Sequence, residues 1–424
     1  MYIFGKYEVV TPLMLGGANH APEFRLASYV HMLRWWWRFL ALSRFETVER
    51  ATYWEAVLFG WHTKGFGRKR VSFRLLSLEE DEFPKSWSNG LDQDNWSGIK
   101  YLTAQGFSER TPVEVRGFKV EALLTKRKLN IDKEREADTY WPLAQQTLVD
   151  AMVLIGMLGG LGARSRRGFG SLAVLKLEVE GGAGEDNETL IDGRPADTDT
   201  YKELIDKHLG AKRHPDLPPY SAFSDQFDFQ ICASHENARE LMNDIGWAFQ
   251  IYRSYGQSDR NGGHIHRKTS ETSSSELKAG ADKGWYNAKF KGDHDVFYAN
   301  PFDNKTFDNR AVFGLPHNYG NADVGLELTG NSKRGRRPSP LLFHFHRLGN
   351  GKTVFVASVV EAKFAPDGAK LRVEKGRRNT HKDFPTAFQE THFPLLHDFA
   401  IFLRNKNATG SGEGVHDTTF EGVL

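Results

Sequence analysis

A glycine-rich loop carrying three arginines constrains the fold of this chain more than any other stretch of its sequence. The run Gly159–Ser171 reads Gly-Gly-Leu-Gly-Ala-Arg-Ser-Arg-Arg-Gly-Phe-Gly-Ser. Glycine permits close approach of the backbone to a ligand and positive φ angles, and successive N–H groups in such a turn form a concave anion site. Guanidinium groups add bidentate contacts to phosphate. The loop predicts contact with a nucleic-acid backbone, and a helix C-cap followed by a solvated basic turn is the alternative.

The elements around this loop follow the order of a ferredoxin-like unit, strand–helix–strand–strand–helix–strand. Apolar periodicity predicts these elements in turn: a strand over Tyr2–Val10, a helix over Pro22–Ser43, strands over Val71–Leu76 and Val113–Leu124, a helix over Asp138–Leu158 and a strand over Ser171–Val179. The loop thus connects the second helix to the last strand. We predict an α+β first domain over residues 1–180.

The second half of the chain repeats this theme with longer and more basic loops. Residues 181–222 are acidic and glycine-bearing at their start, so we expect a linker and connecting segment there. A strand over Asp225–Ala233 and a helix capped by Ser234 open a second ferredoxin-like domain, residues 223–409, with mobile basic insertions. Residues 410–424 are expected to form a loose tail.

Further basic residues could line a common surface with the loop. His31, Arg34 and Arg38 lie at i, i+3 and i+7 on one face of the first predicted helix. In the second half, Arg260 and His264 follow a helix, while Arg336 and Arg337 directly precede a strand. Basic runs of this kind are commonly solvated faces. They indicate a binding site only when they are taken together as one set.

Composition narrows the classes of function. The net charge is only +2, so any nucleic-acid site must come from local clustering of charge. The single cysteine, Cys232, excludes an internal disulfide and favours a reducing, cytoplasmic setting. No apolar run approaches the roughly 20 residues that span a membrane. The pairs His264/His266 and His344/His346 lack further ligands at zinc spacing, so we expect no metal and no cofactor.

Several motifs together resemble those of the RAMP proteins of CRISPR type III systems, and among them the subunit-one family of the type III-B (Cmr) effector complex. The residues that carry the resemblance are Thr11–Leu13, Gly16–Ala18, Glu23–Arg25, Leu33–Arg38, Leu58–Gly60, Gly162–Gly170, Asp293–Asp295, Phe313–Pro316 and Arg336–Leu341. The run Gly162–Gly170 is the most specific of them. Residues 79–98 and 269–284 have no counterpart in that family.

The resemblance implies tandem ferredoxin-like (RRM-type) folds with a glycine-rich loop and membership of a multi-subunit ribonucleoprotein for antiviral defence. The implied partners are guide RNA, held at its 3′ part, target RNA and other RAMP subunits, without a membrane. Target cleavage belongs to a different subunit in such complexes, which implies that this chain is not an enzyme.

On this basis we expect the basic residues to line an RNA groove between the two units. Arg164, Arg166 and Arg167 would clamp phosphates, and Phe169 would either stack on a base or pack within the loop. His31, Arg34 and Arg38 would add contacts from the first unit. The second unit would contribute Arg260, His264, Arg336 and Arg337.

Two alternatives remain open. The first is a metal-independent endoribonuclease that processes guide RNA with His31 as acid or base. The second is a structural adaptor whose loop docks on protein.

Overall fold

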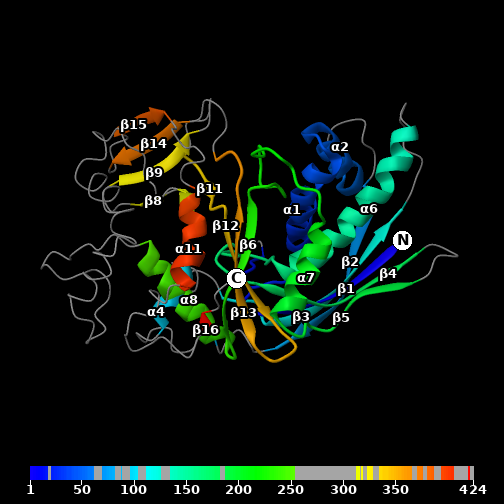
Figure 1. Ribbon diagram of the computed structural model, residues 1–424, viewed down its shortest axis with the longest axis horizontal. Helices are drawn as coiled ribbons and strands as arrows, with labels where there is room; N and C mark the ends of the chain where they lie inside the picture. The colour runs from blue at the N-terminus through cyan, green and yellow to red at the C-terminus, as the bar shows by residue number, and fades with distance from the viewer. Residues whose placement is uncertain are drawn as a thin grey trace, which may run out of the picture.

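The computed structural model describes most of both halves of the chain (Figure 1). The described residues are 1–17, 21–61, 69–81, 87, 96–103, 111–125, 134–181, 187–253, 312–315, 317–318, 322–327, 334–364, 370–375, 380–385, 393–404 and 419–420. Arg260 and His264 lie outside them, as do residues 269–284.

The first unit is built on a five-stranded antiparallel sheet in the order β2-β3-β1-β4-β5. Its elements are β1 (Tyr2–Val9), α1 (Leu26–Phe45), α2 (Val48–Phe59), β2 (Val71–Glu80), α4 (Ser97–Thr103), β3 (Val115–Leu124), α6 (Glu134–Met157), β4 (Leu172–Glu180), β5 (Glu188–Asp192) and α7 (Thr198–Leu209). The first four strands have the pairing of a ferredoxin-like fold, with β3 inserted between β1 and β2. The predicted α+β class and the first ferredoxin-like unit are confirmed.

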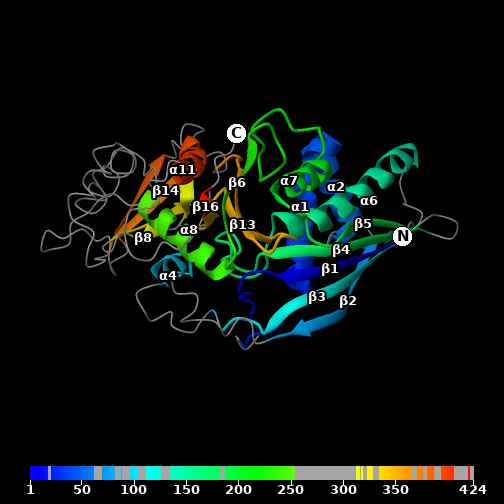
Figure 2. The ribbon, with the colours of Figure 1, turned by 60° about the horizontal axis from the view of Figure 1, so that its bottom comes forward.

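Helices α1 and α6 cover one face of this sheet, with α2 and α7 beside them (Figure 2). Two buried tyrosines connect the sheet to these helices. Tyr29 of α1 donates its hydroxyl proton to Tyr7 of β1 at 2.9 Å, and Tyr7 donates to the Met152 carbonyl of α6 at 2.8 Å. Because both rings are fully buried, each hydroxyl needs such a partner.

The second unit repeats the same arrangement. Strand β6 (Phe227–His235), helix α8 (Ala238–Tyr252), strands β12 (Leu341–Arg347) and β13 (Thr353–Val360), helix α11 (Pro394–Arg404) and strand β16 (Thr419–Phe420) form a sheet in the order β12-β13-β6-β16. All its pairs are antiparallel. The strand order matches the first unit element for element, so the tandem ferredoxin-like fold is confirmed.

Short strands extend the second unit away from the first (Figure 1). A second sheet runs β10-β9-β14-β15, with β8 paired to β9, and β11 pairs with β7. Their bounds are β7 (Gly314–Leu315), β8 (His317–Asn318), β9 (Ala322–Glu327), β10 (Arg334–Gly335), β11 (Arg337–Pro338), β14 (Lys370–Lys375) and β15 (Thr380–Pro385).

Two segments differ from the sequence expectation. Residues 181–222 are not simply a linker, because β5 adds to the first sheet and α7 packs on α6, where His208 bonds Asp150 at 2.8 Å. The expected tail, residues 410–424, supplies β16, in which Thr419 and Phe420 pair with β6. Both segments are too polar or too short for their pairing to be visible in the sequence pattern.

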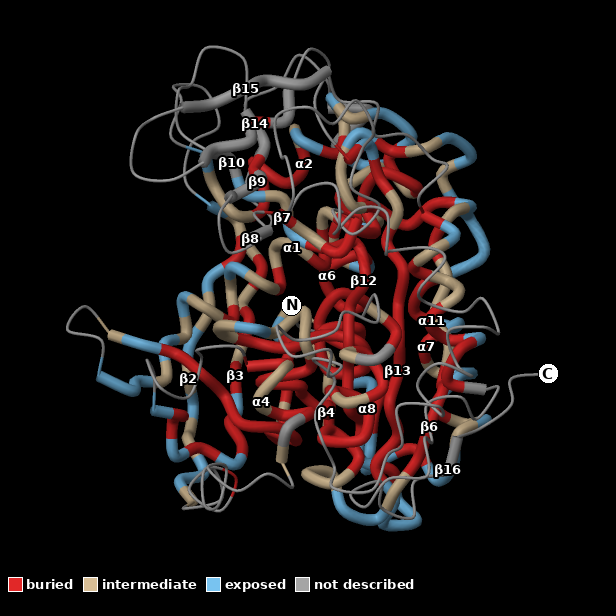
Figure 3. The backbone as a smooth tube through the Cα atoms, turned by 90° about the vertical axis from the view of Figure 1, so that its left-hand side faces the viewer, coloured by how far each residue is buried: buried red, intermediate tan, exposed pale blue. Residues whose placement is uncertain are grey.

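Buried residues, red in Figure 3, occur throughout both units, and two hydrophobic clusters each contain residues of both. Every residue of β13 is buried, because one face of its sheet packs on the first unit and the other on α8 and α11. Helix α4, which comes from the first half of the chain, also joins the units because it packs on α8 of the second. Asn243 of α8 accepts hydrogen bonds from Gly98 and Ile99, and a Cβ on Gly98 would lie 1.8 Å from the Asn243 carbonyl oxygen. Part of the residue 79–98 insertion therefore docks on the second unit. No helix among the described residues has the length and apolarity to cross a bilayer.

Candidate nucleic-acid interface

The glycine-rich loop is a tight turn that is hydrogen-bonded to the segment directly after β1. Ala163 donates its N–H to the Met14 carbonyl at 2.8 Å, and Gly170 donates to the Pro12 carbonyl at 2.9 Å. The Arg167 N–H returns to the Arg164 carbonyl at 2.7 Å. The loop is therefore rigidly placed by the backbone of its own unit.

Two of the three loop arginines point into the second unit. Arg166 donates to the Ser339 carbonyl at 2.8 Å, and Arg167 donates to the Phe313 carbonyl at 3.1 Å with its guanidinium 4.5 Å from the Phe249 ring centre. Burial lowers the pKa of Arg166 to about 10 and that of Arg167 to about 9, with neighbouring arginines adding to the effect. The expectation that all three arginines clamp phosphate is corrected: these two bind the units together.

Backbone contacts support this join. Phe343 of β12 donates its N–H to the Arg166 carbonyl at 3.2 Å. Gly168 has φ +84, and a Cβ there would lie 2.3 Å from the Phe345 ring, so only glycine fits. Phe169 is fully buried, which makes it a packing residue rather than a stacking surface.

Arg164 is the loop arginine that remains exposed. Its φ of +62 lies in the left-handed region, which costs a residue with a side chain on the order of 1 kcal/mol. No hydrogen bond or ion pair joins its guanidinium to another described residue. The loop thus holds one strained, solvent-facing cation at the boundary between the units.

Helix α1 presents the predicted basic stripe, but two of its members are paired. Arg34 and Arg38 both bond the buried carboxylate of Glu55 on α2, with Arg38 Nη2 at 2.5 Å and Arg38 Nε at 2.7 Å from it. Burial opposes ionisation of Glu55, yet the hydrogen bonds from Arg38 and Arg34 lower its pKa overall. The cluster keeps one net positive charge. His31 is exposed one turn earlier.

Aromatic rings connect this stripe to the loop. The Arg166 guanidinium lies 5.5 Å from the Trp35 ring centre, and Trp35 and Ser165 line the same shallow recess between α1 and the loop. Arg34 lies 5.9 Å from the ring of Trp61, which is 40% exposed. The structure therefore brings α1 and the loop together. The sequence pattern did not predict Glu55 or Trp61 as members of this surface. For Trp61, its position between Gly60 and a basic run could have indicated it.

The remaining predicted residues are placed as follows. Arg336 is exposed, whereas Arg337 is directed inward and donates to the Lys363 carbonyl at 2.7 Å, which makes it a packing contact as well.

His344 and His346 are fully buried, and burial lowers the pKa of His344 to about 3. Across the described part of the chain, no group of three His, Cys, Asp or Glu side chains is arranged to hold a metal.

Comparison with known proteins points to one family. Residues 6–173 match the model of the RAMP superfamily, a range that contains α1 and the whole loop. The chain is also 29% identical over 179 residues to the CRISPR system Cmr subunit Cmr1-2 of Pyrococcus furiosus, which covers 40% of this chain and 93% of that protein.

Two solved structures are similar to the chain over most of its length. The crystal structure of Cmr1 from Pyrococcus furiosus in its apo form is 16% identical, with a TM-score of 0.43 over 94% of this chain and 96% of that one. A cryo-EM structure of the type III-B Cmr-beta complex bound to cognate target RNA contains a chain 12% identical, with a TM-score of 0.46 over 94% of this chain and 99% of that one.

Proposed function

Because residues 6–173 match the RAMP superfamily model and the chain is similar to a Cmr subunit, we propose that it is an RNA-binding, non-catalytic subunit of a type III-B CRISPR effector complex. Its ligands are the 3′ region of guide RNA, target RNA or both, and its partners are other RAMP subunits. The similarity to a Cmr subunit supports this assignment.

The observation that carries the RNA-binding proposal is Arg164. A strained backbone conformation persists where surrounding structure imposes it and is concentrated at ligand-binding sites. Here the loop imposes it on an exposed arginine, close to an arginine–tryptophan pair. Phosphate contacts by arginine carry no base information, so binding is expected to tolerate sequence changes in the RNA.

The basic residues of α1 enlarge the RNA-binding surface that we propose around Arg164. His31 and the outward edges of Arg34 and Arg38 flank Trp35, which leads to the loop. Glu55 orients the two guanidiniums in a fixed fork, so they retain donors for phosphate at little further cost in side-chain entropy. The exposed ring of Trp61 beside Arg34 suits the unstacked bases of single-stranded RNA.

The test is binding of a labelled single-stranded RNA to the full chain, followed by gel analysis of the same RNA. We expect binding that weakens steeply with salt, because each neutralised phosphate releases counterions, and RNA that stays intact. Arg164→Ala should weaken binding, and Arg74→Ala is its matched control, since Arg74 is an exposed arginine on β2 paired with Glu121.

Two results would redirect the proposal. Metal-independent cleavage that disappears in His31→Ala would establish the ribonuclease alternative. Tight binding to a partner subunit without any affinity for RNA would establish the adaptor alternative.

A further inference from the structure

Helix α4 belongs to the insertion between β2 and β3 of the first unit, but it packs on α8 of the second. It has seven residues, and helices shorter than about 12 residues are only marginally stable in water on their own. Ile99 and Leu102 are buried in the same hydrophobic cluster as Ile245 and Phe249 of α8. The helical conformation of α4 therefore depends on its docking.

The residues that contact this part of the insertion form one stripe along α8. The stripe consists of Arg239, Asn243, Gly246, Phe249 and, directly after the helix, Arg253. Their spacings of four, three, three and four residues place them on one face of the helix. The Arg239 guanidinium lies 3.8 Å from the ring centre of Trp96, and Arg253 donates to the Tyr101 hydroxyl at 2.9 Å. The contact thus extends along the whole of α8.

The closest approach of the two helices is between two glycines. A Cβ on Gly246 would lie 2.2 Å from the Gly98 carbonyl oxygen. Glycine is poorly favoured inside a helix, so this crossing explains its presence in the middle of α8. Asn243 accepts the N–H groups of Gly98 and Ile99 at 3.1 and 3.3 Å, and its side chain therefore caps the first turn of α4.

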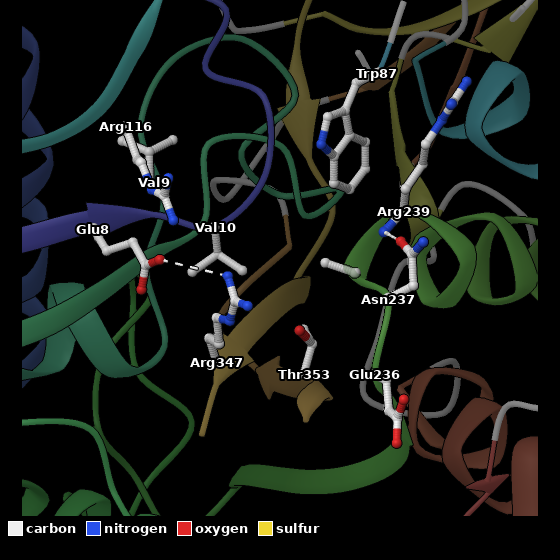
Figure 4. A pocket seen from close by; sticks show the side chains of 11 residues that line it. Glu8, Val9, Val10, Trp87, Arg116, Glu236, Asn237, Arg239, Arg347 and Thr353 are labelled. Carbon is white, nitrogen blue, oxygen red and sulfur yellow. Dashed lines mark hydrogen bonds and ion pairs between the residues drawn. The ribbon is translucent and has the colours of Figure 1, made fainter. Parts of the chain in front are cut away.

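A cavity of about 370 Å³ opens between the two units next to this contact (Figure 4). Glu8 lines it from the first unit, Arg347 and Arg239 line it from the second, and Trp87 of the insertion lines it as well. Arg347 lies 3.9 Å from the Glu8 carboxylate, so the ion pair across the cavity is long. Because protein interiors are otherwise close-packed, the direct contact between the units is weak on this side, and the insertion adds an attachment there.

A second attachment connects the units at the glycine-rich loop. Phe343 donates its N–H to the Arg166 carbonyl at 3.2 Å, and Phe345 donates its N–H to the Ser171 hydroxyl oxygen at 3.1 Å. Strand β12 is at the edge of its sheet, so these two amides point away from β13 and toward the first unit. Their protection from solvent reports whether the two units are in contact.

We propose that α4 acts as a latch: its docking on α8 holds the two units at a fixed relative position, and its release lets the contact between the loop and β12 open. The structure shows the docked state. Release requires little else to change, because α4 is short, is capped from outside and is bound to one face of one helix.

The test is amide hydrogen exchange of the full chain, followed by mass spectrometry on peptides that cover α4 and β12, in Gly246→Ala. Alanine raises the helix propensity of α8, so a loss of protection reports the crossing with Gly98. We expect exchange about tenfold faster in α4 from overpacking at the crossing. In β12 we expect exchange at least about fivefold faster, the lower end of typical coupling between two sites. Strands β1 and β3 should be unchanged.

Two further variants make the result decisive. Asn243→Ala removes the cap without adding an atom, and we expect exchange about fivefold faster in α4, with a smaller increase in β12. Glu240→Ala is the matched control, since it places alanine on α8 outside the stripe and should leave α4 and β12 unchanged. If Gly246→Ala speeds exchange in every strand, the variant is unfolded and Asn243→Ala decides.

Two outcomes would overturn the proposal. Faster exchange in α4 with unchanged exchange in β12 would show that α4 does not hold the units together. Unchanged exchange of α4 in both variants would show that its protection does not come from docking on α8. Neither readout involves RNA, so a wild-type chain that fails to bind RNA removes the proposed function and leaves the latch standing.

Discussion

At the scale of single residues, three neighbouring arginines have different roles. Arg164 is exposed, whereas Arg166 and Arg167 donate to carbonyls of the second unit. The sequence pattern predicts the loop and a contact with phosphate but does not distinguish the three arginines. The distinction depends on Ser339 and Phe313, which lie 173 and 146 positions away in the chain, so no local pattern could reveal it.

The strain at Arg164 leads to a prediction in which stability and binding change in opposite directions. Arg164→Gly removes a side chain from a positive φ angle, so we expect the free energy of unfolding to rise by up to about 1 kcal/mol. RNA affinity falls, because the exposed cation is lost. Denaturant unfolding and RNA titration of the same preparation measure the two effects. A variant that is less stable, or that binds RNA as well as wild type does, contradicts this reading.

At the scale of elements, the sequence predicted the strand and helix order of the first unit because its periodicities are strong. It failed at β5, α7 and β16, where pairing with a distant partner and not local preference decides the structure. It also missed that Arg34 and Arg38 share Glu55, since a helix wheel shows one helix and the carboxylate lies on the next one.

Helix α11 provides a pH-dependent prediction. Burial alone would lower the pKa of His397, but the carboxylate of Asp228, 3.7 Å away, and that of Glu361, hydrogen-bonded at 2.7 Å, raise it to about 9. Because the unfolded value is about 6.5, the stabilisation is complete below about pH 6.5 and is lost as pH rises through about 9. We expect wild type to lose about 1–3 kcal/mol of unfolding free energy across that window.

The matching variant is His397→Gln, which should lower stability at pH 6 and flatten its decline toward pH 9. His31→Gln serves as the control, since His31 is an exposed histidine. Unfolding curves recorded across the window provide the measurement. Equal pH profiles for wild type and His397→Gln would show that this ion cluster does not stabilise the helix.

At the scale of the whole molecule, two ferredoxin-like units are joined by the loop of the first and by α4, which crosses to the second. The two inner arginines of the loop therefore connect the units, whereas its outer arginine faces solvent beside α1. The predicted groove between the units is in large part a packed interface, and the exposed basic surface follows its edge. Whether Arg260 and His264 belong to that surface stays a prediction, because both lie outside the described residues.

The division of labour among the arginines is tested most directly by comparing Arg164→Ala with Arg167→Ala in RNA binding across a salt series and in thermal unfolding. We predict that Arg164→Ala keeps the melting temperature and lowers the slope of log affinity against log salt by about 0.7, the value for one phosphate contact on a single strand. Arg167→Ala should lose about 2–4 kcal/mol of stability and keep the wild-type salt slope at temperatures where it is folded. The reverse pattern, a stable Arg167→Ala with a reduced slope and an Arg164→Ala with an unchanged one, would contradict the account.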